Sequence, residues 1–195
     1  MNYRKILLST AILAFSFHHS QNLKLNPTSA EERWKGYEQR KKLEENSIFK
    51  NLQFRNVGPT TMSGRVTDID ANPENPAEFY VAYASGGLWY TNNNGTTFTP
   101  IFDREAVMTI GDIAIDWKTK TIFVGTGESN SSRSSYAGMG IYKSTNQGKT
   151  WQNLGLKDTH HIGRIVVNPE NNNEIWVAAV GHLYSPNAES GVFKT

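Results

Sequence analysis

The chain of 195 residues contains no cysteine. This absence excludes disulfide bonds, thiol catalysis, zinc–thiolate sites and a lipidated cysteine. Neither sign of charge predominates, because 20 basic and 18 acidic residues leave a formal net charge of +2. The charges are dispersed along the sequence and form no basic face, so we expect no nucleic-acid partner. We also expect no cofactor and no metal site.

Long hydrophobic runs are confined to the N-terminus. A basic segment, Met1–Lys5, precedes an apolar stretch, Ile6–Phe17, that is too short to span a bilayer comfortably. We predict a signal peptide over residues 1–20 and no membrane span after its cleavage. A buried amphipathic helix is the alternative, but the stretch is apolar on all sides. An exported chain without cysteine fits a bacterial envelope, so we expect a secreted or periplasmic protein.

Residues 21–53 form a predicted helical extension. Ser29–Glu32 is a capping box, which marks the start of a helix, and the residues that follow carry charges of both signs. Trp34, Tyr37 and Lys41 lie at i, i+3, i+7 spacing along one side. We predict a surface helix that lies on, or links to, the domain after it.

A polar turn between two β-prone runs occurs twice in the sequence. Gly87 aligns with Gly140 and Gly95 with Gly148, at one offset of 53 residues (140 − 87 and 148 − 95), and a third copy begins at Gly191. A period of about 50 residues built from short strands is typical of a β-propeller, in which each repeat is one blade.

The turn follows the pattern Ser/Thr-x-Asn-x-Gly-x-Thr-aromatic. Its members are Thr91, Asn93, Gly95, Phe98, Ser144, Asn146, Gly148 and Trp151. The asparagine oxygen can accept from backbone N–H groups ahead of it, and the glycine suits the positive φ of a tight turn. The aromatic ring then buries a large apolar face. We interpret all eight as structural turn residues rather than catalytic ones.

The strand pattern after residue 54 predicts an all-β fold. Short β-prone segments recur in units at about 54–102, 110–156 and 162–195, with four segments in each of the first two units and three in the third. We predict two full four-stranded blades plus most of a third, preceded by the signal peptide and the short helix. The matching starts of the first strands are assigned to Gly64, Gly111 and Gly163.

The number of blades has a consequence for the whole protein. Propeller rings usually need about four to eight blades, so residues 54–195 are expected to be an incomplete propeller. We therefore expect the chain to be the front part of a longer protein that supplies the remaining blades.

The turn pattern resembles the Asp-box, or BNR, repeat, with asparagine where that family most often has aspartate. Further motifs resemble the exported bacterial proteins whose N-terminal propeller is similar to that of sortilin and the vacuolar sorting receptors, and which are often labelled glycosyl hydrolases. These motifs are Arg55–Pro59 with Gly64–Val66, Val124–Glu128, Gly140–Thr145, Gly155–Arg164 and Gly181–Tyr184. The resemblance covers about residues 54–195. It implies a long exported chain that binds proteins, peptides or glycans, and it brings no proven activity.

Two long loops between second and third strands are candidate recognition elements, at residues 129–136 and 185–190. In a propeller such loops converge on the central channel, where ligands are expected. The candidate ligand-binding residues beside them are Arg65, Glu128, Arg133, His161, Arg164 and His182. Their carboxylate, imidazoles and guanidinium groups can hold an anionic or sugar ligand. The alternative is that Glu128 pairs with Arg133 or an inner arginine to order the loop, and that the histidines are structural.

Catalysis by this chain alone has little support in the sequence, and no catalytic residue is assigned. Glycosidases need two carboxylates roughly 5 to 10 Å apart, and Glu128 is a single candidate. Xyloglucanase-type propellers of this repeat class look similar and carry a catalytic aspartate just before a Gly-Gly pair; the matching segment here is Ala84–Gly87, with alanine at that position. No arginine triad and tyrosine nucleophile of the sialidase type is evident.

We therefore predict an exported module that binds a protein, peptide or glycan through channel-facing loops. One alternative is a portion of a glycoside hydrolase whose remaining catalytic residues lie downstream. Another is a structural array whose repeats only scaffold a C-terminal domain.

Overall fold

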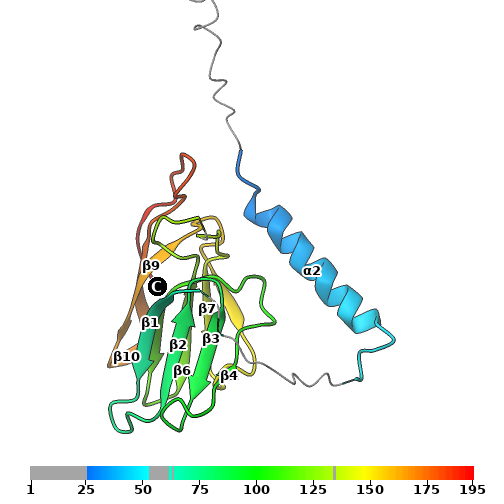
Figure 1. Cartoon of the computed structure of the whole chain (residues 1–195). Helices are drawn as coiled ribbons and strands as arrows, with labels where there is room; N and C mark the ends of the chain where they lie inside the picture. Colours follow the sequence, from blue (N-terminus) through cyan, green and yellow to red (C-terminus); the bar gives the residue numbers. More distant parts are fainter. Residues whose placement is uncertain (1–25, 53–61, 63, 134) are drawn as a thin grey trace, which may run out of the picture.

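Three antiparallel β-sheets form most of the structure, a computed structural model that describes residues 26–52, 62, 64–133 and 135–195. The predicted signal peptide and the motif Arg55–Pro59 lie outside these residues. The first sheet has the strand order β1-β2-β3-β4 (Figure 1). The second has the order β5-β6-β7-β8 and the third β11-β10-β9. Within each sheet, every strand pairs with the next one along the chain, which is the strand order of a propeller blade. The predicted all-β propeller portion is confirmed.

The strands are short, as the sequence predicts. In the first sheet they are β1 (Val66–Ala71), β2 (Phe79–Tyr83), β3 (Gly87–Thr91) and β4 (Thr99–Pro100). In the second they are β5 (Ile110–Asp116), β6 (Thr121–Thr126), β7 (Ile141–Ser144) and β8 (Gln152–Gly155). In the third they are β9 (Ile162–Asn168), β10 (Asn171–Ala179) and β11 (Gly191–Lys194).

The first strands of the sheets lie side by side, because β5 contacts both β1 and β9. Backbone groups of one sheet are bound by aspartates of the sheet before it. Asp68 accepts a hydrogen bond from the Ile113 N–H at 3.2 Å, and Asp112 accepts one from the Ile165 N–H at 2.6 Å. The same type of bond thus joins each sheet to the next and holds the three inner strands in one arc.

Strand pairing corrects the predicted alignment of the inner strands. A register shift falls at Thr67 in β1, at Gly111 in β5 and between Ile162 and Arg164 in β9. Thr67, and not Gly64, is therefore the partner of the other two glycines in the repeat. The interpretation of Gly64 as a matching start is wrong by three residues, because the connections between units differ in length.

Two layers of apolar side chains fill the spaces between the sheets. The layer between the first and second sheets includes Tyr80, Leu88, Phe102, Ile110 and Tyr142, all at most 1% exposed. The layer between the second and third sheets includes Phe123, Ile141, Ile162, Ile165 and Val177, all at most 3% exposed. Burial of these large side chains is the main stabilising contribution to the stack of sheets.

The repeated turns have matching hydrogen bonds. In the second sheet the Asn146 Oδ1 accepts from the Thr150 N–H at 2.9 Å, and the Ser144 Oγ accepts from the Gly148 N–H at 2.9 Å. The corresponding distances at Asn93 and Thr91 of the first sheet are both 3.0 Å. The side chains therefore close both turns in the same way.

The two turn aromatics differ in their surroundings. Phe98 packs edge-on against Phe79 of its own sheet, at 6.0 Å between ring centroids. Trp151 instead packs edge-on against Phe102 of the preceding sheet at 4.9 Å, and its Nε1–H donates to the Ile101 carbonyl at 2.9 Å. Trp151 thus joins two sheets, whereas Phe98 supports one.

The helix α2 (Ala30–Asn46) contacts the loops that connect the strands, at Arg104, Gly138 and Lys157. Its N-cap is Ser29, whose Oγ accepts from the Glu32 N–H at 3.2 Å, as the capping box predicts. Arg33 donates to the carbonyl oxygens of Gly138 at 2.5 Å and Lys157 at 3.2 Å. Among the described residues, no helix combines the length and the apolar character that crossing a membrane requires.

Candidate functional site

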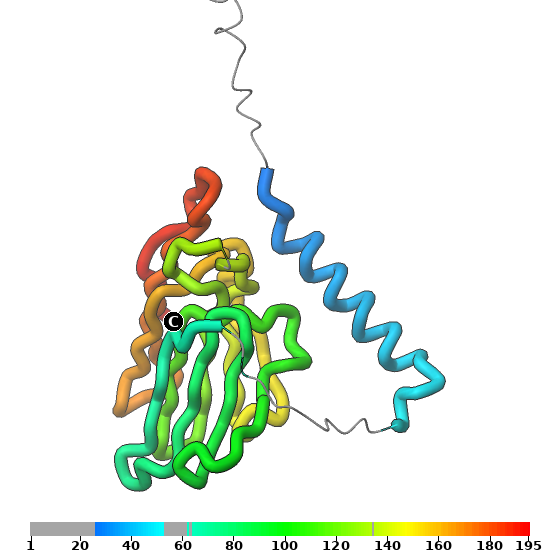
Figure 2. The backbone as a smooth tube through the Cα atoms, viewed as in Figure 1, coloured from blue at the N-terminus to red at the C-terminus, as the bar shows by residue number. Residues whose placement is uncertain are grey.

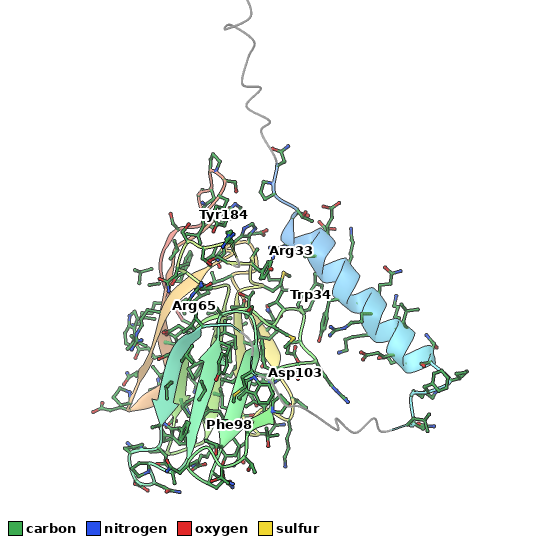
Figure 3. All side chains as sticks on the ribbon, viewed as in Figure 1. Arg33, Trp34, Arg65, Phe98, Asp103 and Tyr184 are labelled. Carbon is green, nitrogen blue, oxygen red and sulfur yellow. The ribbon has the colours of Figure 1, made fainter. Side chains whose placement is uncertain are left out.

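The connections between second and third strands lie at one end of the sheets. They comprise residues 84–86, 127–140 and 180–190, so the second and third are much longer than the first. Figure 2 shows the two long loops, yellow-green and orange-red, beside each other at this end. Figure 3 places Tyr184 and Arg65 toward the same end and Phe98 toward the other. We call the surface around the two long loops the loop face.

Glu128 is the centre of the loop face and is fully buried, at 0% exposed. Its Oε1 accepts from the Arg65 Nε–H at 2.7 Å and also from the Arg65 Nη2–H. Its Oε2 accepts from the Ser135 Oγ–H at 3.2 Å. The hydrogen bonding between the Arg65 guanidinium and the Glu128 carboxylate raises the pKa of Arg65 above its ordinary value. Of the two partners considered for Glu128, the structure has the inner arginine, while Arg133 is exposed.

The long loop of the second sheet is held from both neighbouring sheets. Arg65 donates from Nη2 to the Ser132 Oγ at 2.9 Å, and the Tyr184 hydroxyl donates to the Ser132 carbonyl at 2.6 Å. Arg65, which precedes β1, and Tyr184, which follows β10, therefore both bind Ser132. The arrangement fixes the loop while the Tyr184 side chain stays 64% exposed.

Three positions before the inner strands are structurally equivalent. The carbonyl oxygens of Arg65, Thr109 and His161 accept from backbone N–H groups at 2.8, 2.9 and 2.9 Å, each at the end of the next strand. Arg164 has the repeat position of Asp68 and Asp112, and not that of Arg65.

His161 is a buried imidazole under the loop face, at 2% exposed. Its Nδ1 has no hydrogen-bond partner among the residues that the structure describes. Burial lowers the pKa of His161, and this effect outweighs a hydrogen bond with the Glu128 backbone that favours the charged form. His161 therefore lies beside Glu128 as a neutral ring.

His182 lies beside His160. Its ring stacks on that of His160 at 3.5 Å between centroids, and its nitrogens lie 2.8 Å from the Ser185 Oγ and 2.8 Å from the Asp158 carbonyl. Burial, followed by the charge of His182, lowers the pKa of His160 to about 4. The stack ties the loop before β9 to the loop after β10.

Arg164 lies on the inner strand surface and not among the long loops. Its side chain is 65% exposed, and its Nη1 donates to the buried Asp112 carboxylate at 3.2 Å. Burial is the main cause that raises the pKa of Asp112 to about 7, and the charge of Asp68 adds to it. Among the described residues, no group of three or more histidine, aspartate or glutamate side chains can hold a metal ion.

Four residues of this region were not predicted as site residues. They are Thr109, Asp112, Ser135 and Tyr184. Thr109 and Asp112 are at the repeat positions of Arg65 and Asp68, so a correct alignment of the inner strands would have found them. Ser135 lies in the predicted loop 129–136 and Tyr184 in the motif Gly181–Tyr184, but the sequence pattern does not show that Ser135 binds Glu128 of its own loop or that Tyr184 binds Ser132 of the preceding unit.

Comparison with solved structures identifies the class of fold. The chain superposes on an ancestral GH74 enzyme with a TM-score of 0.51 at 18% identity, covering 70% of this chain and 18% of the other. A GH74 enzyme of Niastella koreensis superposes with a TM-score of 0.48 at 22% identity, covering 65% of this chain and 19% of the other. PorZ, an essential surface component of the type-IX secretion system of Porphyromonas gingivalis, superposes with a TM-score of 0.45 at 19% identity, covering 66% of this chain and 17% of the other.

No family model matches the sequence, and no curated protein is similar to it. The chain spans less than a fifth of the length of each of the three solved propeller proteins named above. The similarity shows the fold, so the chain is a portion of a β-propeller that resembles part of a GH74 enzyme.

Proposed function

We propose that the chain is a binding module, in which the loop face recognises a protein, peptide or glycan. One observation carries this proposal: the buried Glu128 carboxylate is used to fix Arg65 and the loop around Ser135, rather than being offered to solvent. A loop fixed in this way is preorganised, which reduces the entropy cost of binding a ligand.

The groups left accessible on the loop face suit recognition. Tyr184 is 64% and Tyr136 61% exposed, and the Arg65 side chain is 45% exposed. Aromatic rings beside a guanidinium group provide stacking surfaces and hydrogen-bond donors for sugars, carboxylates or peptide groups. The exposed Arg133 adds a further positive charge to the same loop.

A glycoside hydrolase portion is the alternative function. It requires a carboxyl group that can exchange a proton with a glycosidic oxygen, and a second carboxylate across a cleft. Both Glu128 oxygens are occupied by protein donors, which favours binding over catalysis. The fold similarity to a GH74 enzyme, at 18% identity, does not decide between the two functions.

The module is further proposed to work within a longer exported propeller of the sortilin-like, Asp-box type. The basic and apolar N-terminal residues support export to the bacterial envelope. The three sheets of the described residues form an arc, and rings of this type usually need about four to eight blades, which supports further blades in the working protein.

Binding can be tested with soluble β-glucan oligosaccharides and with a peptide library, using calorimetry. Tyr184→Ala is expected to weaken binding of the recognised probe by about tenfold or more. Phe49→Ala is the matched control, because Phe49 is an aromatic residue that is 55% exposed after α2, away from the loop face. Equal binding by the two variants contradicts the proposal. Turnover of a β-glucan that Glu128→Gln abolishes would support the hydrolase instead.

A further inference from the structure

A groove with a volume of about 800 Å³ lies between the first and second sheets. The first sheet and the connection after it contribute Tyr90 and residues 99–101 and 103–105, and the second sheet contributes residues 147–149 and Trp151. Both sheets have four strands. The volume is in the range of ligand pockets, which is about 300–1,000 Å³. We call this surface the sheet-1/2 groove.

The sheet-1/2 groove is separate from the loop face. None of the residues that line it belongs to the long loops at 127–140 and 180–190. Figure 3 shows Asp103, which lines the groove, well apart from Tyr184 of the loop face. A ligand in the groove therefore binds the protein at a second place.

Helix α2 holds one part of the groove lining in position. The Arg40 Nη2–H donates to the carbonyl oxygens of Arg104 and Glu105, at 2.6 and 3.1 Å. The Tyr37 hydroxyl donates to the Glu105 carboxylate at 3.3 Å. The connection between the two sheets is thus fixed by the helix before a ligand binds, which reduces the entropy cost of binding.

Two aromatic side chains line the groove, and the protein itself binds their polar atoms. The Trp151 Nε1–H donates to the Ile101 carbonyl at 2.9 Å, and the Tyr90 hydroxyl donates to the Glu78 carboxylate at 2.9 Å. Both side chains are partly buried. These rings are therefore held in place and offer a ligand apolar ring surface rather than hydrogen bonds.

Four polar side chains of the groove are exposed and open to a ligand. Asp103, Arg104, Gln147 and Lys149 make no side-chain hydrogen bond or ion pair within the part of the chain that the structure describes. Burial raises the pKa of Asp103, as expected of a carboxyl group without a donor to stabilise its charge. A ligand hydroxyl group can supply that donor.

The charges in the groove favour an uncharged ligand. Asp103 and Glu105 are balanced by Arg104 and Lys149, so an anionic or a cationic ligand meets both signs of charge. A hydroxyl group both donates and accepts hydrogen bonds, and it can therefore bind carboxylate, guanidinium, ammonium and amide groups alike. Sugar rings carry several hydroxyl groups and also have an apolar C–H face that packs on aromatic rings.

We propose that the sheet-1/2 groove is a second binding site and takes a neutral oligosaccharide. The sugar rings pack on Trp151 and Tyr90, and their hydroxyl groups bind the four open polar side chains. The site is independent of the loop face, so its ligand need not be the one that the loop face recognises.

The test applies an array of neutral and uronic-acid oligosaccharides to the full chain and measures the strongest binder by calorimetry. Gln147→Ala is expected to weaken binding by about fivefold or more, because a hydrogen-bonding side chain is lost. Asn94→Ala is the matched control and should bind equally well. Asn94 has the corresponding position in the first turn, with a φ of +54° against +59° for Gln147, and does not line the groove. Asp103→Ala should weaken binding to a similar degree as Gln147→Ala.

Tyr184→Ala distinguishes the groove from the loop face, since it should leave the affinity of the groove unchanged. Hydrogen exchange provides a readout without any variant: the oligosaccharide is expected to slow exchange of backbone amides at residues 103–105 and 147–149.

Equal weakening by Gln147→Ala and Asn94→Ala, or no effect of either, overturns the proposal. Protection confined to residues 129–136, with binding lost only in Tyr184→Ala, assigns the oligosaccharide to the loop face and also overturns it. An array on which no neutral oligosaccharide binds, or on which uronic-acid oligosaccharides bind best, contradicts the inference from the balanced charges.

Discussion

Arg65 and Glu128 pair across 63 residues of sequence, the arginine from the segment before β1 and the carboxylate from the loop after β6. The carboxylate is fully buried, so its charge depends on this partner and on the Ser135 hydroxyl. The pair therefore connects the first sheet to the loop that forms most of the loop face.

Loss of the Arg65 side chain tests this connection. Arg65→Ala leaves the Glu128 carboxylate buried with only neutral donors, so we expect the Tm to fall by roughly 5 °C or more. Arg133→Ala, in an exposed arginine of the same loop, is the control and should change the Tm little. Thermal unfolding followed by circular dichroism measures both. Equal shifts for the two variants would show that the pair does not stabilise the loop.

The turn asparagines give a second prediction. Asn146→Ala removes the acceptor of the Thr150 N–H, and the free energy of unfolding should fall by about 1–2 kcal/mol. Asn146→Asp keeps that acceptor, and the Thr150 hydroxyl can turn to donate to the new carboxylate, so the loss should be less than about 0.5 kcal/mol. Urea titration distinguishes the two. An aspartate variant as unstable as the alanine variant would contradict the proposed role of the oxygen.

Alanine variants of two glycines with positive φ distinguish the cost of backbone strain from the cost of close packing. Gly155 has a φ of +112° and no atom within 4 Å of a Cβ placed on it, whereas Gly148 has a φ of +80° and the Ile101 side chain at 2.8 Å. Both alanine variants are strained at the backbone, at a cost of about 1–2 kcal/mol. Gly148→Ala should lose about 1 kcal/mol more in urea titration. The reverse order would show that Ile101 moves aside without cost.

The Asp112 carboxyl gives a pH dependence of stability. Its pKa is raised to about 7 in the folded state, above the value of about 3.9 expected for an unfolded chain. The folded state thus binds this proton more tightly, so the stabilisation is full below about pH 4 and is lost as the pH rises to 7 and above.

Comparison with Asp112→Asn isolates this carboxyl from other titrating groups. Between pH 5 and pH 8 the unfolding free energy of the native protein should decrease relative to that of the variant, on the order of 2 kcal/mol. Denaturant titrations at several pH values measure the difference. Parallel pH profiles for the two proteins would show that Asp112 is ionised throughout.

Local interactions made much of the fold predictable. The asparagine, glycine and aromatic residue of each turn act within eight residues, so their pattern identified the hairpins and the repeat. The N-cap at Ser29 was predictable for the same reason, since the cap and its partner Glu32 are three residues apart. The sequence could not decide whether Glu128 pairs with Arg133 or with the inner arginine Arg65, because either guanidinium group can donate to the carboxylate.

The sequence by itself determined the turns, the strand order within each sheet and the helix start, because these depend on neighbours along the chain. Tertiary structure alone decided which inner-strand residues are equivalent, which arginine binds Glu128 and which serine Tyr184 reaches. Register shifts and loops of unequal length break the spacing of the repeat, so contacts between sheets do not follow from the period.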